Sequence, residues 1–288
     1  MSENSAHVSF LPGSSFELDF LADLYTRTFA DYFYPCLVTP AEMVEIVRVE
    51  QLDLDRCPVM LCGKEPVGFA TLGIRGSESY CRGFGVIVPY RGKGLGHVLC
   101  DEMIRLAKDA GARRMVLGVI KENIPALQTY GRAGFQTLRE MISLEWSADA
   151  DGAGRRNRKS SADQVVEASP EDLLRQFEAL HTVQPVWDRD LPSLRERDDL
   201  RGLAVISGGV TEAHVLIREH GERVEIVDLA ARAGGGASQH VGSLLSKLQE
   251  AHPQLVCHNE PADSPVLDAL LASGFRETVR RLQLGRTF

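Results

Sequence analysis

The chain has 288 residues, of which 44% are hydrophobic and 25% are charged, and this is enough for two domains of ordinary size that each bury a core. A formal net charge of -8 argues against a nucleic-acid-binding protein, which needs a basic face to displace counterions. The six cysteines form no C-x-x-C pair and no zinc-ligand spacing, so we predict reduced thiols and no metal. No segment has the length of a membrane span or the pattern of a secretory signal, which predicts a cytoplasmic protein.

Hydrophobic periodicity predicts mixed α/β structure along the first half of the chain. Apolar residues recur at helical spacing in some segments and form short β-branched runs in others. The predicted elements, in chain order, are a helix at 16–31, a helix at 39–49, strands at 58–62, 66–72 and 80–88, a helix at 97–107, a strand at 114–120, a helix at 125–132 and a strand at 135–146. With one earlier strand near the N-terminus, the order is β-α-α-β-β-β-α-β-α-β.

The segment from residue 84 to residue 107 carries the strongest functional signal. The run Val86, Ile87 and Val88 predicts a buried strand that must stop at Pro89. The loop that follows consists of Arg91, Gly92, Lys93, Gly94, Leu95 and Gly96 and leads directly into the helix, which begins at His97. The first amide groups of a helix have no partner inside it, so a phosphate can dock there if glycines leave the backbone bare. A tight turn, however, needs glycines whether or not anything binds.

This loop has the pattern R-x-x-G-x-G and fits neither a dinucleotide fingerprint nor a nucleotide P-loop. A second segment follows at 117–135 and contains Leu117-Gly118-Val119, Asn123, Ala126, Tyr130 and Gly134-Phe135. Together the two motifs resemble the GNAT family of N-acetyltransferases. The resemblance implies an α/β (α+β) domain with a mixed, mostly antiparallel twisted sheet, which transfers acetyl from acetyl-CoA to an amine without a metal. It implies CoA contacts from Val86, Ile87, Val88, Arg91, Gly92, Lys93, Gly94, Leu95, Gly96, His97, Asn123, Ala126 and Tyr130.

The same resemblance implies roles for side chains outside the loop. Tyr130 is the candidate general acid, because a phenol with a pKa of about 10 is near an alkyl thiolate in basicity; the alternative is an ordinary core aromatic. In several relatives a catalytic Glu stands at the place of Tyr80. Glu78, two residues earlier on the same face of the strand, is a candidate base. The alternatives are that water removes the proton and that Glu78 is an ordinary surface carboxylate. The candidate substrate contacts are Asp31, Tyr32, Tyr34 and Tyr80, and core packing is the alternative for the aromatic residues.

The composition changes abruptly at residues 149–164, where small and charged residues replace large apolar ones. This predicts a linker between a catalytic, acetyl-CoA-binding domain at 1–148 and a second domain at 165–288.

The second half of the chain repeats the first. The repeated pieces are the loop Arg232-Ala233-Gly234-Gly235-Gly236-Ala237 and the pair Gly274-Phe275. Leu270 stands where Tyr130 stands, and the strand before the loop carries Glu225 and Asp228. We therefore predict a degenerate second GNAT-like domain without CoA that takes the place of a dimer partner, giving a monomer or a weak homodimer. The tandem arrangement resembles the mycothiol synthase family, in which the C-terminal copy is the active one.

Two functions remain open from the sequence. The first is an N-acetyltransferase that acts on a small-molecule amine, with no nucleic acid or membrane as partner. The second is a non-catalytic acyl-CoA-binding or scaffolding pair of domains that has kept the fold and lost turnover. The intact loop and Tyr130 favour the first function, whereas the missing base favours the second.

Overall fold

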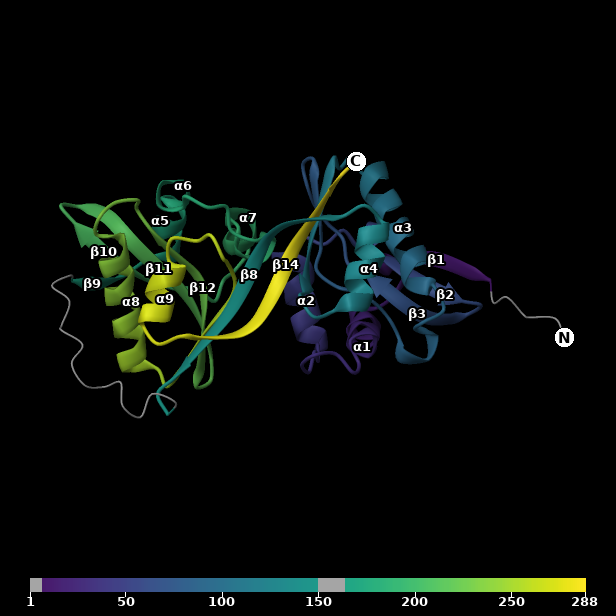
Figure 1. The fold of residues 1–288 in the computed structure, drawn as a ribbon, viewed down its shortest axis with the longest axis horizontal. Coiled ribbons are helices and arrows are strands. Elements are labelled where there is room, and N and C mark those ends of the chain that lie inside the picture. Colours follow the sequence, from purple (N-terminus) through teal and green to yellow (C-terminus); the bar gives the residue numbers. More distant parts are fainter. Residues whose placement is uncertain (1–6, 150–163) are drawn as a thin grey trace. The chain divides into compact units, whose positions relative to one another are not determined.

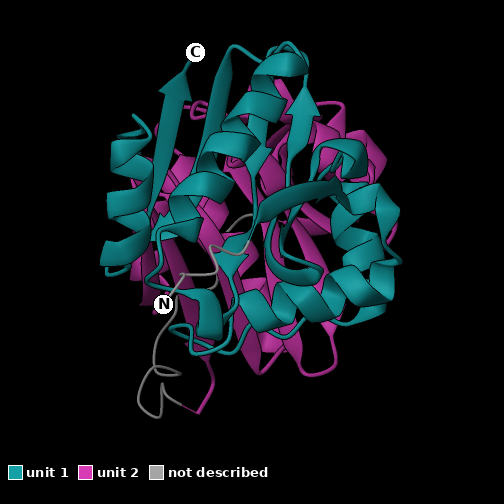
Figure 2. Ribbon diagram, turned by 90° about the vertical axis from the view of Figure 1, so that its right-hand side faces the viewer, with its two compact units in different colours: residues 1–138, 282–288 teal, residues 139–281 magenta. Residues whose placement is uncertain are grey.

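The computed structural model describes residues 7–149 and 164–288. Contacts between Cα atoms divide the chain into two compact units (Figure 2). Unit 1 contains residues 1–138 and 282–288, and unit 2 contains residues 139–281. The linker predicted at 149–164 lies almost entirely outside the described residues.

Unit 1 places helices against two groups of strands (Figure 1). Its elements are β1 (Val8–Pro12), α1 (Leu18–Thr28), α2 (Pro40–Val49), β2 (Pro58–Cys62), β3 (Glu65–Ala70), β4 (Gly73–Arg75), β5 (Glu78–Cys81), β6 (Phe84–Val86), α3 (Leu95–Asp109), β7 (Arg114–Ile120), α4 (Ile124–Arg132), the start of β8 (Gln136–Ser147) and the end of β14 (Arg276–Thr287). Strands β1-β2-β3-β6 form an antiparallel sheet. The second group has the order β4-β5-β7-β14-β8, and its β5 and β7 are parallel.

The predicted elements of the first half are present, with one correction. Thr39 and Glu42 form a capping box at the start of α2, an arrangement typical of the first turn of a helix. The strand predicted at 80–88 is instead divided into β5 and β6, and Val88 belongs to a single 3-10 turn (Val88–Tyr90) where it is 42% exposed. Proline provides no N–H for a strand ladder but fits the first turn of a helix, so Pro89 moves Val88 out of the strand.

Unit 2 also packs helices against strands (Figure 1), but its strands follow a single order. Its elements are the rest of β8, β9 (Val165–Ala168), α5 (Pro170–Leu174), α6 (Phe177–Leu180), a 3-10 turn (Trp187–Arg189), α7 (Leu191–Arg195), β10 (Arg201–Ser207), β11 (Val210–His220), β12 (Arg223–Ala231), α8 (Ala237–Ala251), β13 (Gln254–Pro261), α9 (Leu267–Ala272) and the start of β14. The strand order is β14-β8-β13-β12-β11-β10-β9. The pair β12–β13 is parallel, as β5–β7 is in unit 1.

Strands β8 and β14 each contribute residues to both units. In unit 1, the last residue of the chain, Phe288, donates its backbone N–H to the carbonyl of Arg113 at 2.9 Å, and Leu284 is only 4% exposed within the unit 1 core. The two units divide at 138/139 and 281/282. Periodicity identifies a strand but does not say which sheet the strand joins.

Candidate active site

The loop between β6 and α3 has a backbone conformation that suits an anion. Gly92 and Gly94 have φ values of +74° and +81°, which residues with a side chain rarely adopt. Gly94 is the N-cap of α3 and provides no side-chain cap. A Cβ added at either glycine would meet nothing within 4 Å, so no neighbouring side chain covers the loop. Left-handed residues next to a helix start turn successive amide groups toward one point, where a phosphate can bind.

Arg91 lies in this loop but its side chain bonds to the protein itself. Its Nε donates to the carbonyl of Val86 at 2.9 Å, and its Nη2 donates to the carbonyls of Thr28 and Ala30 at 3.0 Å and 2.8 Å. The guanidinium thus ties the end of α1 to the end of β6. The second cation of this loop, Lys93, places its ammonium 5.1 Å from the ring centre of Tyr90.

His97, which directly follows the predicted phosphate loop, faces Arg132 of α4. The two side chains approach to 3.0 Å between His97 Nε2 and Arg132 Nη1. An arginine can only donate, so Nε2 accepts this hydrogen bond and Nδ1 carries the hydrogen. His97 therefore joins the start of α3 to the end of α4.

The parallel strands β5 and β7 part beside the loop and form a fork. Their pairing runs from Glu78–Arg114 to Cys81–Leu117, after which the chain leaves β5 and, as β6, pairs with β3 instead. The next residue on β7, Gly118, is exposed. Strands that part leave backbone N–H and C=O groups without a ladder partner, and an extended ligand that contains amides can pair with them. We call this place the unit 1 fork.

Tyr130 belongs to α4 and lies close to this fork. Asn123 caps the helix, because its Oδ1 accepts from the N–H of Ala126 at 3.2 Å. The Tyr130 ring lies 5.5 Å from Phe84 and 5.6 Å from Phe135 between ring centres, and the residue is 5% exposed. Burial raises the pKa of the phenol well above 10. Tyr130 is therefore both a core aromatic and a phenol that stays protonated at neutral pH.

The loop after α1 brings one of the candidate substrate contacts to Tyr130. Tyr32 is close enough that its charge would further raise the pKa of Tyr130, and its ring meets Phe29, Phe33 and Tyr34 edge-on at 5.1–5.3 Å. Asp31 is exposed, with a left-handed φ of 59°.

Glu78 and Tyr80 lie elsewhere. Glu78 forms an ion pair with Arg114 at 3.2 Å, and its side chain is 39% exposed. Cys81, which influences the pKa of Tyr130, is three residues further along β5, or about 10 Å at the usual strand rise. Because side chains alternate along a strand, Glu78 and Tyr80 point to the face opposite Cys81. The structure does not bring these two candidates to Tyr130.

A buried ion pair, which the sequence analysis missed, lies in the same unit. Glu50 follows α2, is 2% exposed and pairs with Arg82. Both influence the pKa of Tyr25, which burial raises far above its ordinary value. The Tyr25 ring lies against Gly83, where an added Cβ would come within 2.2 Å of Cε2. A glutamate at a helix end usually faces solvent, and no sequence signal marks Glu50 as buried.

The six cysteines are all free thiols. Within residues 7–149 and 164–288, no three His, Cys, Asp or Glu side chains are placed to hold a metal ion. In the same residues, no helix is both long enough and apolar enough to cross a membrane.

Comparisons with known proteins agree with this geometry. Residues 18–135 match the family model described as the acetyltransferase (GNAT) family. YobR of Bacillus subtilis (strain 168), described as an uncharacterized N-acetyltransferase, is 38% identical over 71 residues, which are 23% of this chain and 29% of that protein. The chain thus spans less than a third of this curated relative.

Two solved structures have a similar fold along almost the whole chain. One is a GCN5-related N-acetyltransferase from Sphaerobacter thermophilus, with a TM-score of 0.71, 14% identity and coverage of 97% of this chain and 95% of that one. The other is a tandem GNAT protein from the clavulanic acid biosynthesis pathway, with a TM-score of 0.69, 13% identity and 98% coverage of both chains. At this identity the likeness concerns the fold, which in both units is α/β.

Proposed function

Residues 18–135 match the family model of the acetyltransferase (GNAT) family, and on this premise we propose that the protein is an acetyl-CoA-dependent N-acetyltransferase that acts on a small-molecule amine through unit 1. One observation carries the proposal. The left-handed loop at the start of α3, the open fork of β5 and β7 and a buried, protonated tyrosine occur in the same unit.

The residues present fit CoA. Amide groups of the loop around Gly92 and Gly94, together with Lys93, would hold the pyrophosphate. The backbone at the fork, including the end of β6, would pair with the amides of the pantetheine arm. Acetyl-CoA supplies an activated acyl group in the form of a thioester. Backbone N–H groups near Val86 and Ile87 would orient its carbonyl.

In this proposal Tyr130 donates the proton that the departing thiolate needs. Burial keeps the phenol protonated, and its ring is fixed by two aromatic neighbours. The amine must be neutral to attack. In this proposal water takes its proton, because Glu78 is paired with Arg114 and points to the face of β5 opposite Cys81. Tyr32, whose charge would further raise the pKa of Tyr130, would contact the amine.

The proposal also assigns the roles of the two halves. The first half is the catalytic domain, and the second is a degenerate GNAT-like domain that replaces a homodimer partner. A chain of 31.7 kDa should then be a monomer or a weak dimer in solution, which light scattering over a range of concentrations measures.

A thiol-release assay tests the function. The full chain is incubated with acetyl-CoA and a panel of primary amines, and free CoA is measured with a thiol reagent. Amine-dependent release of CoA supports the proposal. CoA binding by calorimetry without turnover on any amine would instead support a non-catalytic acyl-CoA-binding protein, and the ion pair that engages Glu78 with Arg114 is the observation that favours this second function.

A further inference from the structure

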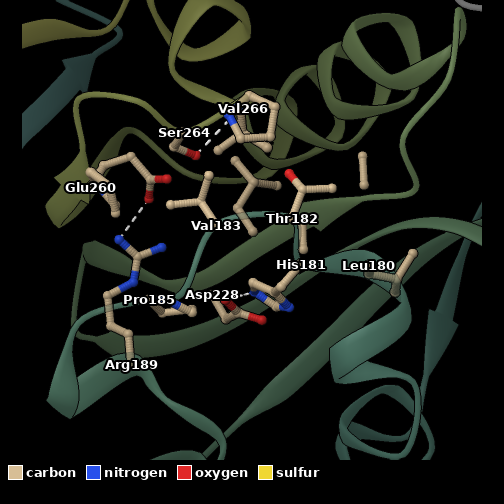
Figure 3. A pocket seen from close by; sticks show the side chains of 15 residues that line it. Leu180, His181, Thr182, Val183, Pro185, Arg189, Asp228, Glu260, Ser264 and Val266 are labelled. Carbon is tan, nitrogen blue, oxygen red and sulfur yellow. Dashed lines mark hydrogen bonds and ion pairs between the residues drawn. The ribbon is translucent and has the colours of Figure 1, made fainter.

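Unit 2 has a fork of its own, and Arg189, which Figure 3 shows beside Glu260, bridges it. The parallel pairing of β12 and β13 ends at Ile226–Cys257. The next residue on each strand is Val227 and His258, respectively. Arg189 donates from Nε to the carbonyl of Val227 at 2.7 Å and from Nη1 to the carbonyl of His258 at 2.9 Å. One guanidinium therefore bonds to both strands at the point where they part.

The positive charge of Arg189 is balanced by a neighbouring carboxylate. Its Nη1 lies 2.6 Å from Glu260 Oε2, and the two side chains are only 6% and 4% exposed. A buried guanidinium is tolerated only when it is paired and hydrogen-bonded, and Arg189 meets both conditions. Glu260 comes from β13, two residues beyond His258, so the pair extends the bridge along that strand (Figure 3).

A small pocket lies next to Arg189 and Glu260. Its walls come from the end of β12, the residues around Glu260, the segment before α9 and the segment 180–185 after α6. His181 and Asp228 lie on one side and are joined at 3.0 Å (Figure 3). Each of the two cations in this pocket, Arg189 and His181, is thus already next to a carboxylate.

The phosphate loop of unit 2 also differs in its backbone. Gly236, the N-cap of α8, has a φ of -96°, and Gly234 and Gly235, which the structure describes, are not left-handed either. A Cβ on Gly236 would lie 2.7 Å from Nε2 of His240, so an imidazole covers the start of this helix. The loop repeats the sequence motif of unit 1 without its anion-binding conformation.

We propose that Arg189, held in place by Glu260, closes the fork of unit 2 to CoA and so determines that only unit 1 binds it. The two carbonyls that a pantetheine amide would meet at this fork are already bonded to the guanidinium. The inference rests on the proposed use of CoA by unit 1. Arg189 is thereby a specificity-determining residue, although it lies outside every motif of the sequence.

The test removes the CoA site of unit 1 and opens the fork of unit 2. Calorimetry with CoA is carried out on the wild-type chain, on Gly94→Val and on the triple variant Gly94→Val/Arg189→Leu/Glu260→Leu. We expect one CoA site per wild-type chain and no detectable site in Gly94→Val. In the triple variant we expect one new site that binds CoA at least about tenfold more weakly than the wild-type site, since the loop of unit 2 adds little affinity. Two sites in the wild-type chain, or a folded triple variant that binds no CoA, would overturn the inference.

Two controls keep the outcomes distinct. A wild-type chain that binds no CoA contradicts the proposed function alone, because the triple variant still reports on the fork of unit 2. Replacing a buried ion pair by apolar residues of similar size is generally tolerated, and thermal unfolding checks this. If the variant with the two leucines does not fold, Arg189→Met with Glu260→Gln in the same Gly94→Val background removes the bridge and keeps a polar group at position 260. Gain of a CoA site in this variant supports the inference. A folded variant without a CoA site overturns it.

Discussion

In both units a pair of parallel strands separates to form a fork, but the residues at the point of separation differ. In unit 1 the residue after the last pair on β7 is an exposed glycine, Gly118. In unit 2 the equivalent residue on β13 is His258, whose carbonyl is bonded to Arg189. The fold creates the fork, but a side chain from elsewhere in the unit decides whether the fork can accept a ligand. A fold comparison alone therefore does not identify the binding unit.

The two loops extend the same comparison. Both have the pattern R-x-x-G-x-G/A, yet only Gly92 and Gly94 take left-handed φ values, whereas Gly236 has a φ of -96°. A pattern of glycines permits this conformation without requiring it. The loop of unit 1 is thus the one suited to a pyrophosphate, and each of the following experiments changes one side of the comparison.

The largest effect is expected from the loop glycines. Gly94→Val places a β-branched residue at a φ of +81° and should lower CoA affinity by about 100-fold or more, because backbone strain of about 1–3 kcal/mol adds to lost phosphate contacts. Gly235→Val is the matched control, since Gly235 is not left-handed and nothing lies within 4 Å of an added Cβ. Calorimetry measures both affinities. Equal losses in the two variants would remove the distinction between the loops.

The next effect concerns the tyrosine that unit 2 lacks. Tyr130→Phe should lower turnover by roughly 100-fold while CoA affinity stays within a few-fold, as expected when a proton donor used only in the transition state is lost. Tyr25→Phe is the control, because it removes another buried phenol of unit 1 without removing the proposed donor. Steady-state kinetics with an amine found in the panel provides the measurement. Unchanged turnover in Tyr130→Phe would return Tyr130 to a packing role.

Much of this architecture could be predicted from the sequence because it depends on local patterns. The strands at 58–62 and 114–120 were predicted with the observed bounds, and the capping box of α2 follows from Thr39 and Glu42. These features follow from periodicity and hydrogen bonding within a few residues. The glycine turn before α3 could be predicted for the same reason, since its glycines and its helix are contiguous.

The parts that could not be predicted depend on residues that are far apart in the sequence. Arg189 and Val227 are 38 residues apart, and the buried pair Glu50 and Arg82 is separated by 32. Arg91 was expected to face a phosphate, yet its side chain bonds to carbonyls more than 60 residues away. A charged residue in a sequence carries no sign of whether a distant backbone will surround it, so burial of charge has to be observed.

A smaller effect is expected at the unit 1 fork. Gly118→Val adds a side chain at the exposed position where β7 leaves β5, and a β-branched residue is well tolerated in a strand. CoA affinity should fall about tenfold, which corresponds to about 1.4 kcal/mol, while the thermal midpoint changes little. His258→Val is the matched variant in unit 2 and should leave CoA affinity unchanged, since its fork is bridged by Arg189. An equal loss of affinity in His258→Val would place CoA in unit 2.

The smallest effect is a pH dependence of stability that belongs to unit 2. His181 places Nδ1 at 2.8 Å from the carbonyl of Phe177 and Nε2 at 3.0 Å from Asp228. Both partners are acceptors when Asp228 is ionised, so both ring nitrogens carry hydrogens and the imidazole is cationic. Burial lowers the pKa of His181, as does Arg189 more weakly, but the charge and hydrogen bond of Asp228 outweigh them and the pKa is raised overall. Asp228 also binds His214 at 2.6 Å, and its own pKa is lowered despite burial.

The sign of the effect follows from linkage. A raised pKa of His181 stabilises the folded state fully below the unfolded value of about 6.5, and this stabilisation is lost as the pH rises through the folded pKa. The free energy of unfolding should therefore decrease from pH 6 toward pH 8 in the wild-type chain, and His181→Gln should remove most of that decrease. Urea titrations at both pH values measure it. In unit 1 the buried pair is Glu50 and Arg82, which contains no histidine, so Glu50→Gln should leave the slope between pH 6 and 8 unchanged; a slope that survives His181→Gln but disappears in Glu50→Gln would move the titrating group to unit 1.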